Sequence, residues 1–132
     1  MKKFSTTVRV RYQETDAMGV VYYANYLVWF EIVRTEYLRS LGFPYKEIES
    51  RGAYLMVAEA HCEYLAPARY DDVIEIQTWI SSVKNCSLAF EYNLFLEKKL
   101  ISKGRTNHVF VNRDGKPVKV PADLRPLLTS AA

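Results

Sequence analysis

Cysteine and histidine are both scarce, with two of each in 132 residues. Cys62 and Cys86 are far apart and form no close-spaced metal or redox motif. We expect buried free thiols, although the sequence leaves a disulfide open. His61 and His108 each lie alone within an expected strand, where histidine is more often structural or exposed than catalytic. The sequence therefore predicts neither a bound metal nor a resident cofactor.

No apolar run approaches the length of a membrane span, and the lysine-rich start is not followed by the apolar stretch of a signal peptide. We therefore predict a cytoplasmic protein without a transmembrane segment. Lysine and arginine exceed aspartate and glutamate by a net charge of +3, but they are scattered along the chain. This pattern gives no support for a nucleic-acid partner and slightly favours small anionic molecules.

Three further features are missing: a Gly-x-Ser-x-Gly motif, an internal repeat and a linker-like segment. The first absence argues against a serine hydrolase with a nucleophile elbow. The others predict one domain over residues 1–132, a length that can bury a substantial core. What the chain has in excess is aromatic residues, at 14% with ten tyrosines, which is typical of interfaces or an aromatic-lined cleft.

The longest regular pattern runs from about Tyr22 to Leu41, where no proline or glycine interrupts the chain. Apolar residues recur there with the helical period, at Tyr26, Phe30, Val33, Tyr37 and Leu41. Gly42 and Pro44 then provide a helix stop. The apolar arc is wide, so we predict a central helix that the rest of the chain wraps. Glu31 is placed to pair with Arg34 at i+3.

Period-two alternation predicts strands at residues 4–12, 53–65, 72–82, 88–96 and 100–111. In the first, Val8, Val10 and Tyr12 share a face; in the second, Leu55, Val57, Glu59, His61 and Glu63 do. A short helical turn is possible within residues 44–52, and a terminal helix is expected at residues 121–128. The fold class is therefore α+β, with one long helix against a curled, mostly antiparallel five-stranded sheet. Its open edges and face favour a symmetric dimer or a dimer of dimers.

Asp16 is the strongest candidate for chemistry, because it lies just before the long helix. Unpaired N–H groups and the positive end of the helix dipole point outward there. Gly19 permits a tight turn, and N–H groups near Tyr22 and Tyr23 could stabilise a carbonyl oxygen that becomes negative. A carboxylate beside such a helix terminus suits acyl-transfer hydrolysis. The alternative is that Asp16 only caps the helix or its preceding turn.

Two segments carry a family resemblance: ETDAMGVVYYANYLVWFEIVRTEYL, starting at Glu14, and EYLAPARYDDVIEI, starting at Glu63. They resemble the hot-dog-fold acyl-CoA thioesterases, in the branch of 4-hydroxybenzoyl-CoA thioesterase and the Tol-Pal-associated short-chain enzymes. The resemblance implies that Asp16 is the catalytic carboxylate and that the backbone N–H of Tyr23 polarises the thioester carbonyl. It also implies a continuous-sheet dimer, often a homotetramer, with active sites at the dimer interface and no cofactor beyond the coenzyme A of the substrate.

The expected substrate-binding residues are Gly19, Tyr22, Tyr26 and Lys84. Two departures from the family pattern limit this set. Many Tol-Pal-associated members carry histidine where this chain has Tyr23, so only the backbone role carries over. The basic cluster that meets the coenzyme A phosphates in 4-hydroxybenzoyl-CoA thioesterase is reduced here to Lys84. The segment around Lys84 therefore gives no support for aromatic acyl specificity.

The sequence leaves alternatives open for both the mechanism and the class of function. Asp16 either attacks the thioester directly or activates a water molecule. A non-catalytic module that binds acyl-CoA or acyl-carrier protein could use the same cleft, and a hot-dog dehydratase is a weaker option. Those dehydratases need a histidine in a loop rich in proline and glycine before the helix. The loop around Asp16 contains no histidine.

Overall fold

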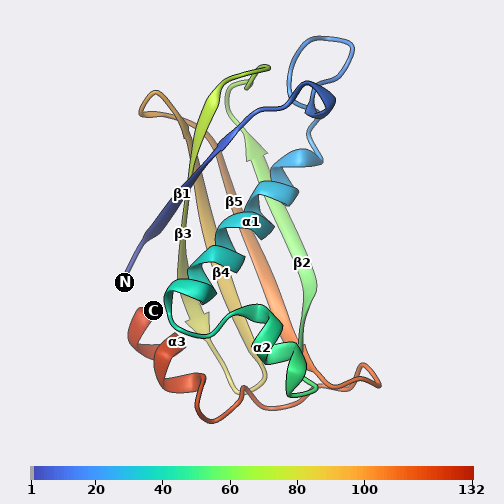
Figure 1. Ribbon diagram of the computed structural model, residues 1–132, viewed down its shortest axis with the longest axis vertical. Helices are drawn as coiled ribbons and strands as arrows, with labels where there is room; N and C mark the ends of the chain where they lie inside the picture. Colours follow the sequence, from blue (N-terminus) through green and yellow to red (C-terminus); the bar gives the residue numbers. More distant parts are fainter. Residues whose placement is uncertain (1) are drawn as a thin grey trace.

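The computed structural model describes residues 2–132 (Figure 1). The regular elements, in chain order, are β1 (Phe4–Arg9), a 3-10 turn (Tyr12–Glu14), α1 (Asn25–Ser40), α2 (Tyr45–Ser50), β2 (Tyr54–Tyr64), β3 (Val73–Val83), β4 (Ser87–Leu96), β5 (Lys99–Val111) and α3 (Arg125–Ala131). The strands form one five-stranded sheet in the order β1-β3-β4-β5-β2, and every neighbouring pair is antiparallel. The sheet curls around α1, which confirms the expected α+β architecture (Figure 1).

The predicted apolar row of α1 faces the sheet. Tyr26, Phe30, Val33 and Tyr37 are all buried, and the ring of Phe30 stacks on Tyr92 of β4 with centroids 4.2 Å apart. Gly104 of β5 lies directly beneath the Phe30 ring, and an added Cβ atom at this position would overlap the ring. The missing side chain is what allows the helix to lie so close to the sheet.

Three predicted element ends are wrong, and one of them is the start of α3, at Arg125 instead of near Pro121. The first strand ends at Arg9 instead of Tyr12, and Tyr12 is 78% exposed because the chain turns there into the 3-10 segment. The helix begins at Asn25 instead of Tyr22. The backbone N–H of Tyr22 donates to the carbonyl of Glu14 at 2.9 Å, and Thr15 pairs with Val21, so this stretch is extended.

A bulge in β2 overturns the predicted face of that strand. The pairing with β5 shifts between Val57 and Glu59, with Leu55 opposite Phe110 before the shift and Ala60 opposite Thr106 after it. The extra residue reverses which alternate side chains point inward. Leu55 is consequently buried, whereas His61 is exposed on the outer face.

A buried polar chain crosses the core beneath α1. His108 is fully buried, and its Nε2 lies 2.7 Å from the hydroxyl of Thr106, which in turn contacts the hydroxyl of Tyr92. Burial and, secondarily, the charge of Arg34 lower the pKa of His108 to about 3. His108 is therefore a neutral structural histidine, as its isolated position in a strand predicted.

Among residues 2–132, no helix is long and apolar enough to cross a membrane. Both cysteines are free thiols and partly buried.

The first prediction concerns the close approach of α1 to β5. We expect Gly104→Ala to lower the free energy of unfolding by about 1–3 kcal/mol, because the new methyl group overpacks the core. Denaturant titration measures the loss. In a Phe30→Leu background, which makes room for the methyl group, the same substitution should cost clearly less. An equal cost in both backgrounds would mean that the contact with Phe30 is not the cause.

The second prediction concerns pH. The unfolded chain protonates His108 near its ordinary pKa of 6.5, whereas the folded chain holds the imidazole neutral down to about pH 3. Stability is therefore lost as pH falls through this window, by about 2 kcal/mol between pH 7 and pH 5. His108→Gln should lack this part of the pH dependence, while His61→Gln, at an exposed site, should retain it. Urea titrations at several pH values measure this dependence. The same change of the free energy of unfolding with pH in the wild type and in His108→Gln would refute the assignment.

Candidate active site

The loop before α1 is a tight turn built around Asp16. The N–H of Asp16 donates to the carbonyl of Val20 at 2.9 Å, and the N–H of Gly19 donates to the carbonyl of Asp16 at 2.9 Å. The Oδ1 atom of Asp16 accepts a hydrogen bond from the N–H of Met18 at 2.8 Å. Gly19 has a φ of 79°, a left-handed conformation that favours glycine. Asp16 thus shapes its own turn through one oxygen, and within residues 2–132 no donor is hydrogen-bonded to its other oxygen, Oδ2.

This turn is fixed to the segment that follows β2. Val20 pairs with Arg69, and the N–H of Val21 donates to the carbonyl of Ala68 at 2.8 Å. These contacts bring two segments together that are far apart in the sequence, the loop at Asp16 and the turn at Pro67. They are the two segments that carry the family resemblance.

The start of α1 leaves donors unused. The N–H of Tyr22 is bonded to Glu14, and that of Asn25 to the carbonyl of Tyr22. In the described part of the chain, the N–H groups of Tyr23 and Ala24 form no hydrogen bond. Ala24 is the N-cap residue of α1 and Tyr23 directly precedes it, so both N–H groups lie at the positive end of the helix dipole. Of the two tyrosines predicted at this position, only Tyr23 therefore has a free backbone donor.

A cavity of about 370 Å³ joins the acid and the helix start. Its lining residues are Asp16, Val20, Val21, Tyr23, Tyr26, Tyr64, Leu65, Ala66 and Pro67. Most of this wall is apolar or aromatic, with one carboxylate. Such a surface suits a ligand that has an apolar body and one polar reacting group.

Tyrosines form the aromatic side of the cavity. The hydroxyl of Tyr64 donates to the carbonyl of Tyr23 at 2.9 Å, and its ring packs edge-on against Tyr26 at 4.9 Å. Burial and the neighbouring Cys62 thiol raise the pKa of Tyr64 above its ordinary value, and burial likewise raises the pKa of Tyr26. Both phenols therefore stay protonated near neutral pH, and Tyr64 remains a donor that holds the Tyr23 peptide in place.

Glu14 organises the site, although no pattern in the sequence indicates this role. Its buried carboxylate accepts hydrogen bonds from the backbone N–H of Arg11 at 2.8 Å and from the indole N–H of Trp29 at 3.1 Å. Its carbonyl accepts from the N–H of Tyr22 and from the amide of Asn25. Glu14 thereby ties the loop to the first turn of α1. An acid next to an expected strand end carries no sequence signal for such a role.

The predicted substrate-binding residues are only partly brought together. Tyr26 lines the cavity, and Gly19 lies at the tip of its loop. Tyr22 packs beside Tyr23 with ring centroids 4.6 Å apart but does not line the cavity. Lys84 follows β3, and its carbonyl accepts from Arg125 of α3. This end of the sheet lies beside α3, whereas the Asp16 loop is at the opposite end (Figure 1). Within one chain, Lys84 is thus remote from Asp16.

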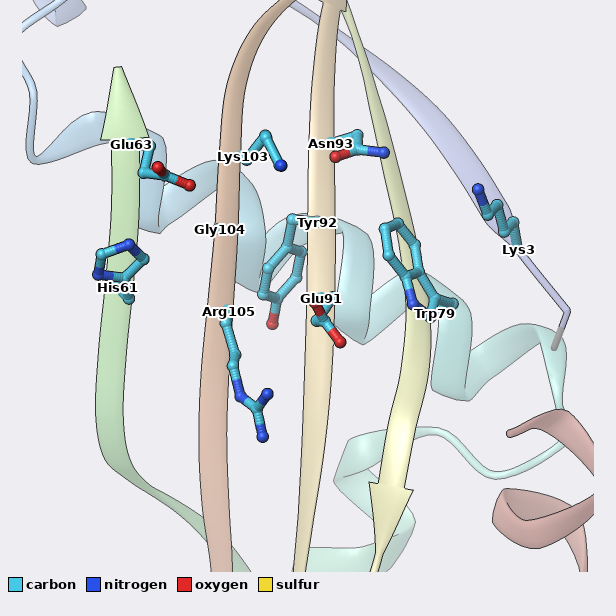
Figure 2. Close-up of a pocket in the computed structure, with 10 residues that line it drawn as sticks. All are labelled: Lys3, His61, Glu63, Trp79, Glu91, Tyr92, Asn93, Lys103, Gly104 and Arg105. Carbon is cyan, nitrogen blue, oxygen red and sulfur yellow. The ribbon is translucent and has the colours of Figure 1, made fainter. Parts of the chain in front are cut away.

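A larger hollow, of about 490 Å³, lies on the outer face of the sheet. Figure 2 shows its charged side chains, among them Glu63, Glu91, Lys103 and Arg105, around His61 and Trp79. The described residues contain no group of three or more histidine, cysteine, aspartate or glutamate side chains placed to hold a metal. The outer hollow lacks an unpaired helix start and a mainly apolar wall. The cavity at Asp16 is therefore the better candidate for acyl chemistry.

A curled antiparallel sheet around one long helix is the hot-dog fold. The family model described as "Thioesterase-like superfamily" matches residues 10–128. The chain belongs to this family, as its sequence motifs predicted.

Individual relatives agree with this assignment. The acyl-CoA thioesterase YbgC of Haemophilus influenzae is 37% identical over 124 residues, which cover 92% of this chain and 91% of that protein. The crystal structure of DHNA-CoA thioesterase from Staphylococcus aureus is 30% identical with a TM-score of 0.95, covering 98% of this chain and 91% of that one. A crystal structure of an Aquifex aeolicus protein is 37% identical with a TM-score of 0.91, covering 95% and 98%.

The third prediction tests Glu14. We expect Glu14→Gln to lower the free energy of unfolding by about 1–3 kcal/mol, because the amide has one acceptor oxygen where two donors converge. Its NH₂ group would face the N–H of Arg11 or of Trp29. Denaturant titration measures the loss, and Glu36→Gln at the exposed surface of α1 is the control. A variant as stable as the wild type would show that this carboxylate does not hold the loop to the helix.

Proposed function

We propose that the protein is an acyl-CoA thioester hydrolase that uses Asp16 as its catalytic carboxylate. The observation that carries this proposal is that Asp16 and Tyr23, a residue with a free backbone N–H, line one largely apolar cavity. The relatives named for the hydrolysis of coenzyme A thioesters support the reaction class.

In the proposed reaction, the thioester carbonyl oxygen accepts a hydrogen bond from the N–H of Tyr23. Negative charge develops on this oxygen as the carbonyl is attacked, and a donor already fixed at the positive helix end stabilises it. Tyr64 supports this geometry by holding the carbonyl of the same residue, in the peptide unit that follows the Tyr23 N–H. Because only the backbone takes part, the reaction does not require histidine in place of Tyr23.

Asp16 acts through Oδ2, the oxygen that the turn does not use. In one route it attacks the carbonyl, expels the coenzyme A thiolate and forms an anhydride, which water then hydrolyses. In the other it takes a proton from a water molecule that attacks the carbonyl. Both routes consume one water molecule and yield the free acid and the coenzyme A thiol. Neither route draws on a metal or a resident cofactor.

The cavity wall formed by Val21, Tyr26 and Leu65 suits the acyl group. The proposed roles of Gly19 and Tyr22 rest on their place in the chain, directly beside the lining residues Val20, Val21 and Tyr23. Lys84 can contribute to the binding of the coenzyme A phosphates only from a second copy, because it lies at the far end of its own sheet.

The proposed assembly is a two-fold dimer with a continuous sheet and active sites at the interface, able to pair into a tetramer. β2 is an edge strand with Met56 and Val57 exposed, 48% and 45% respectively, which favours its pairing with another copy. Two further statements stay predictions: that residues 1–132 form a single hot-dog domain, and that the protein is cytoplasmic.

A second candidate function is a module that binds acyl-CoA or acyl-carrier protein without hydrolysing it. The same apolar cavity would hold the acyl group. Release of free thiol from a panel of acyl-CoA chain lengths separates the two. Multiple turnovers support the hydrolase, and retained acyl-CoA without thiol release supports the binder.

The fourth prediction concerns Asp16→Asn. The amide oxygen can still accept from the N–H of Met18, so we expect the loop, the fold and the assembly to persist. Turnover should fall on the order of a hundredfold or more, since the amide is neither an effective base nor an effective nucleophile. Asp114→Asn, in the turn after β5, is the control and should keep wild-type turnover. Thiol release close to the wild-type rate in Asp16→Asn would remove Asp16 from the mechanism.

A single turnover in ¹⁸O-labelled water tests for the direct route. Label found in the Asp16 carboxylate indicates direct attack and an anhydride. Label found only in the released acid is the result of water activated by Asp16, and equally of an anhydride that water opens at the acyl carbon.

A further inference from the structure

Three exposed residues beside the Asp16 cavity have no role in the chemistry proposed above: Tyr12, Arg69 and Tyr70, which we call the rim cluster. Tyr12 is 78% exposed and Tyr70 is 58% exposed, and their rings pack edge to face with centroids 5.6 Å apart. Arg69 directly precedes Tyr70 and is exposed as well. Exposed aromatic surface that is grouped beside a cavity indicates a contact with a ligand or a partner.

The rim cluster is fixed to both segments that form the Asp16 cavity. Arg69 pairs with Val20, a residue of the cavity wall. The carbonyl of Tyr12 accepts a hydrogen bond from the hydroxyl of Thr15 at 2.7 Å, and Thr15 directly precedes Asp16. A ligand that extends out of the cavity past Val20 therefore reaches the rim cluster.

The guanidinium of Arg69 is available to such a ligand. Within residues 2–132 it forms no hydrogen bond and no ion pair. The two acids that follow in the chain are already engaged, since Asp71 pairs with Arg9 at 3.3 Å and Asp72 accepts from the backbone N–H of Arg69 at 2.8 Å. A free guanidinium presents a planar set of N–H donors that matches a phosphate group.

Arg34 shows that an arginine without an acid partner can still be occupied. In the described part of the chain, Arg34 and Glu31 form no ion pair, so the i+3 pair expected from the sequence is wrong. Arg34 turns inward and donates to the hydroxyl of Tyr92 at 3.5 Å, and Glu31 accepts from the hydroxyl of Thr35 at 3.0 Å. Both side chains thus have protein partners, which Arg69 lacks.

The outer hollow of the sheet also contains bases, Lys103 and Arg105, but its surroundings differ (Figure 2). Glu63 and Glu91 line the same hollow, so an anion there would meet repulsion as well as attraction. The hollow shares no lining residue with the Asp16 cavity, and α1 lies on the opposite face of the sheet. The outer hollow is therefore not an extension of the Asp16 site.

We propose that the rim cluster binds the nucleotide half of a coenzyme A thioester, with the adenine ring on Tyr12 and Tyr70 and a phosphate on Arg69. This inference rests on the acyl-CoA hydrolysis proposed above and assigns residues to the part of the substrate that does not react. The pantetheine arm joins the nucleotide to the thioester, so the nucleotide lies outside the cavity. Lys84 is at the far end of its own sheet, whereas the rim cluster adjoins the cavity.

The chemistry of a nucleotide matches each member of the rim cluster. Nucleobases stack on aromatic side chains whatever the base, because every base has a π-face. Phosphate accepts charge-assisted hydrogen bonds from a guanidinium, which are stronger than those between neutral groups. An apolar ligand would leave Arg69 unpaired, and an inorganic anion would leave both tyrosines exposed. A nucleotide satisfies all three residues at once.

Comparison of acyl-CoA with acyl-pantetheine, which lacks the nucleotide, tests the proposal. Arg69→Gln should lower kcat/KM for acyl-CoA about tenfold and leave kcat/KM for acyl-pantetheine unchanged, because only the phosphate contact is lost. The double variant Tyr12→Ala/Tyr70→Ala should lower kcat/KM for acyl-CoA about fivefold or more, again without effect on acyl-pantetheine. The loss caused by Arg69→Gln should shrink at high salt, since salt screens an exposed charge pair.

Binding of free coenzyme A provides a readout that does not depend on hydrolysis. Isothermal titration calorimetry should show a dissociation constant about tenfold higher in Arg69→Gln than in the wild type. The double variant Tyr12→Phe/Tyr70→Phe keeps both rings and should bind like the wild type. The matched control is Arg39→Gln, which removes an exposed arginine of α1 that pairs with Glu36 at 3.4 Å and should change neither substrate. Far-ultraviolet circular dichroism checks the fold of each variant.

Equal losses for acyl-CoA and acyl-pantetheine, or no loss for acyl-CoA in any rim-cluster variant, would overturn the inference. A loss in Lys84→Gln without one in Arg69→Gln would place the nucleotide at a second copy instead. A loss seen only with acyl-carrier protein as the substrate would assign the rim cluster to a protein carrier. Coenzyme A binding that depends on Arg69 in a chain that releases no thiol would support the subsite and reject the proposed activity.

Discussion

The ring of Phe30 lies against the backbone of β5 at Gly104, and the rest of the molecule depends on this close approach. The ring also stacks on Tyr92, so one side chain of α1 contacts two central strands. A side chain at residue 104 would lift the helix from the sheet. The free donors of the site lie at the start of α1. The packing of Phe30 against Gly104 therefore also fixes the position of these donors relative to Asp16.

The site itself is held by polar contacts that the core does not provide. Glu14 connects the loop to Trp29 and Asn25 of α1, and Tyr64 connects the end of β2 to the Tyr23 peptide. The acid and the free N–H groups come from residues 16–24, and the apolar wall combines residues 20–26 with residues 64–67. Hydrogen bonds of Glu14 and Tyr64 hold these parts in place, which suits a site that must be preorganised before the substrate arrives.

Much of the fold could be predicted from local patterns. The row from Tyr26 to Tyr37 faces the sheet as its period predicts, and the alternation in β4 places Phe90 and Tyr92 in the core. The predictions failed where distant contacts intervene. The bulge in β2 depends on its register with β5, and the start of α1 depends on the bond from Tyr22 to Glu14. Lys84 lies at the other end of its own sheet from Asp16, so its role at the substrate stays a prediction that involves a second copy.

The sequence by itself determined the order of helix and strands, the buried face of α1 and the family motif around Asp16. These features follow from side-chain period and from short segments that are contiguous along the chain. Only the tertiary structure decided that Tyr23, and not Tyr22, keeps a free N–H, that Glu14 holds the loop, and that Glu31 and Arg34 stay apart. Each of these depends on the hydrogen-bond partner that a remote segment of the chain supplies. A donor that is already bonded to such a partner is not available to a ligand.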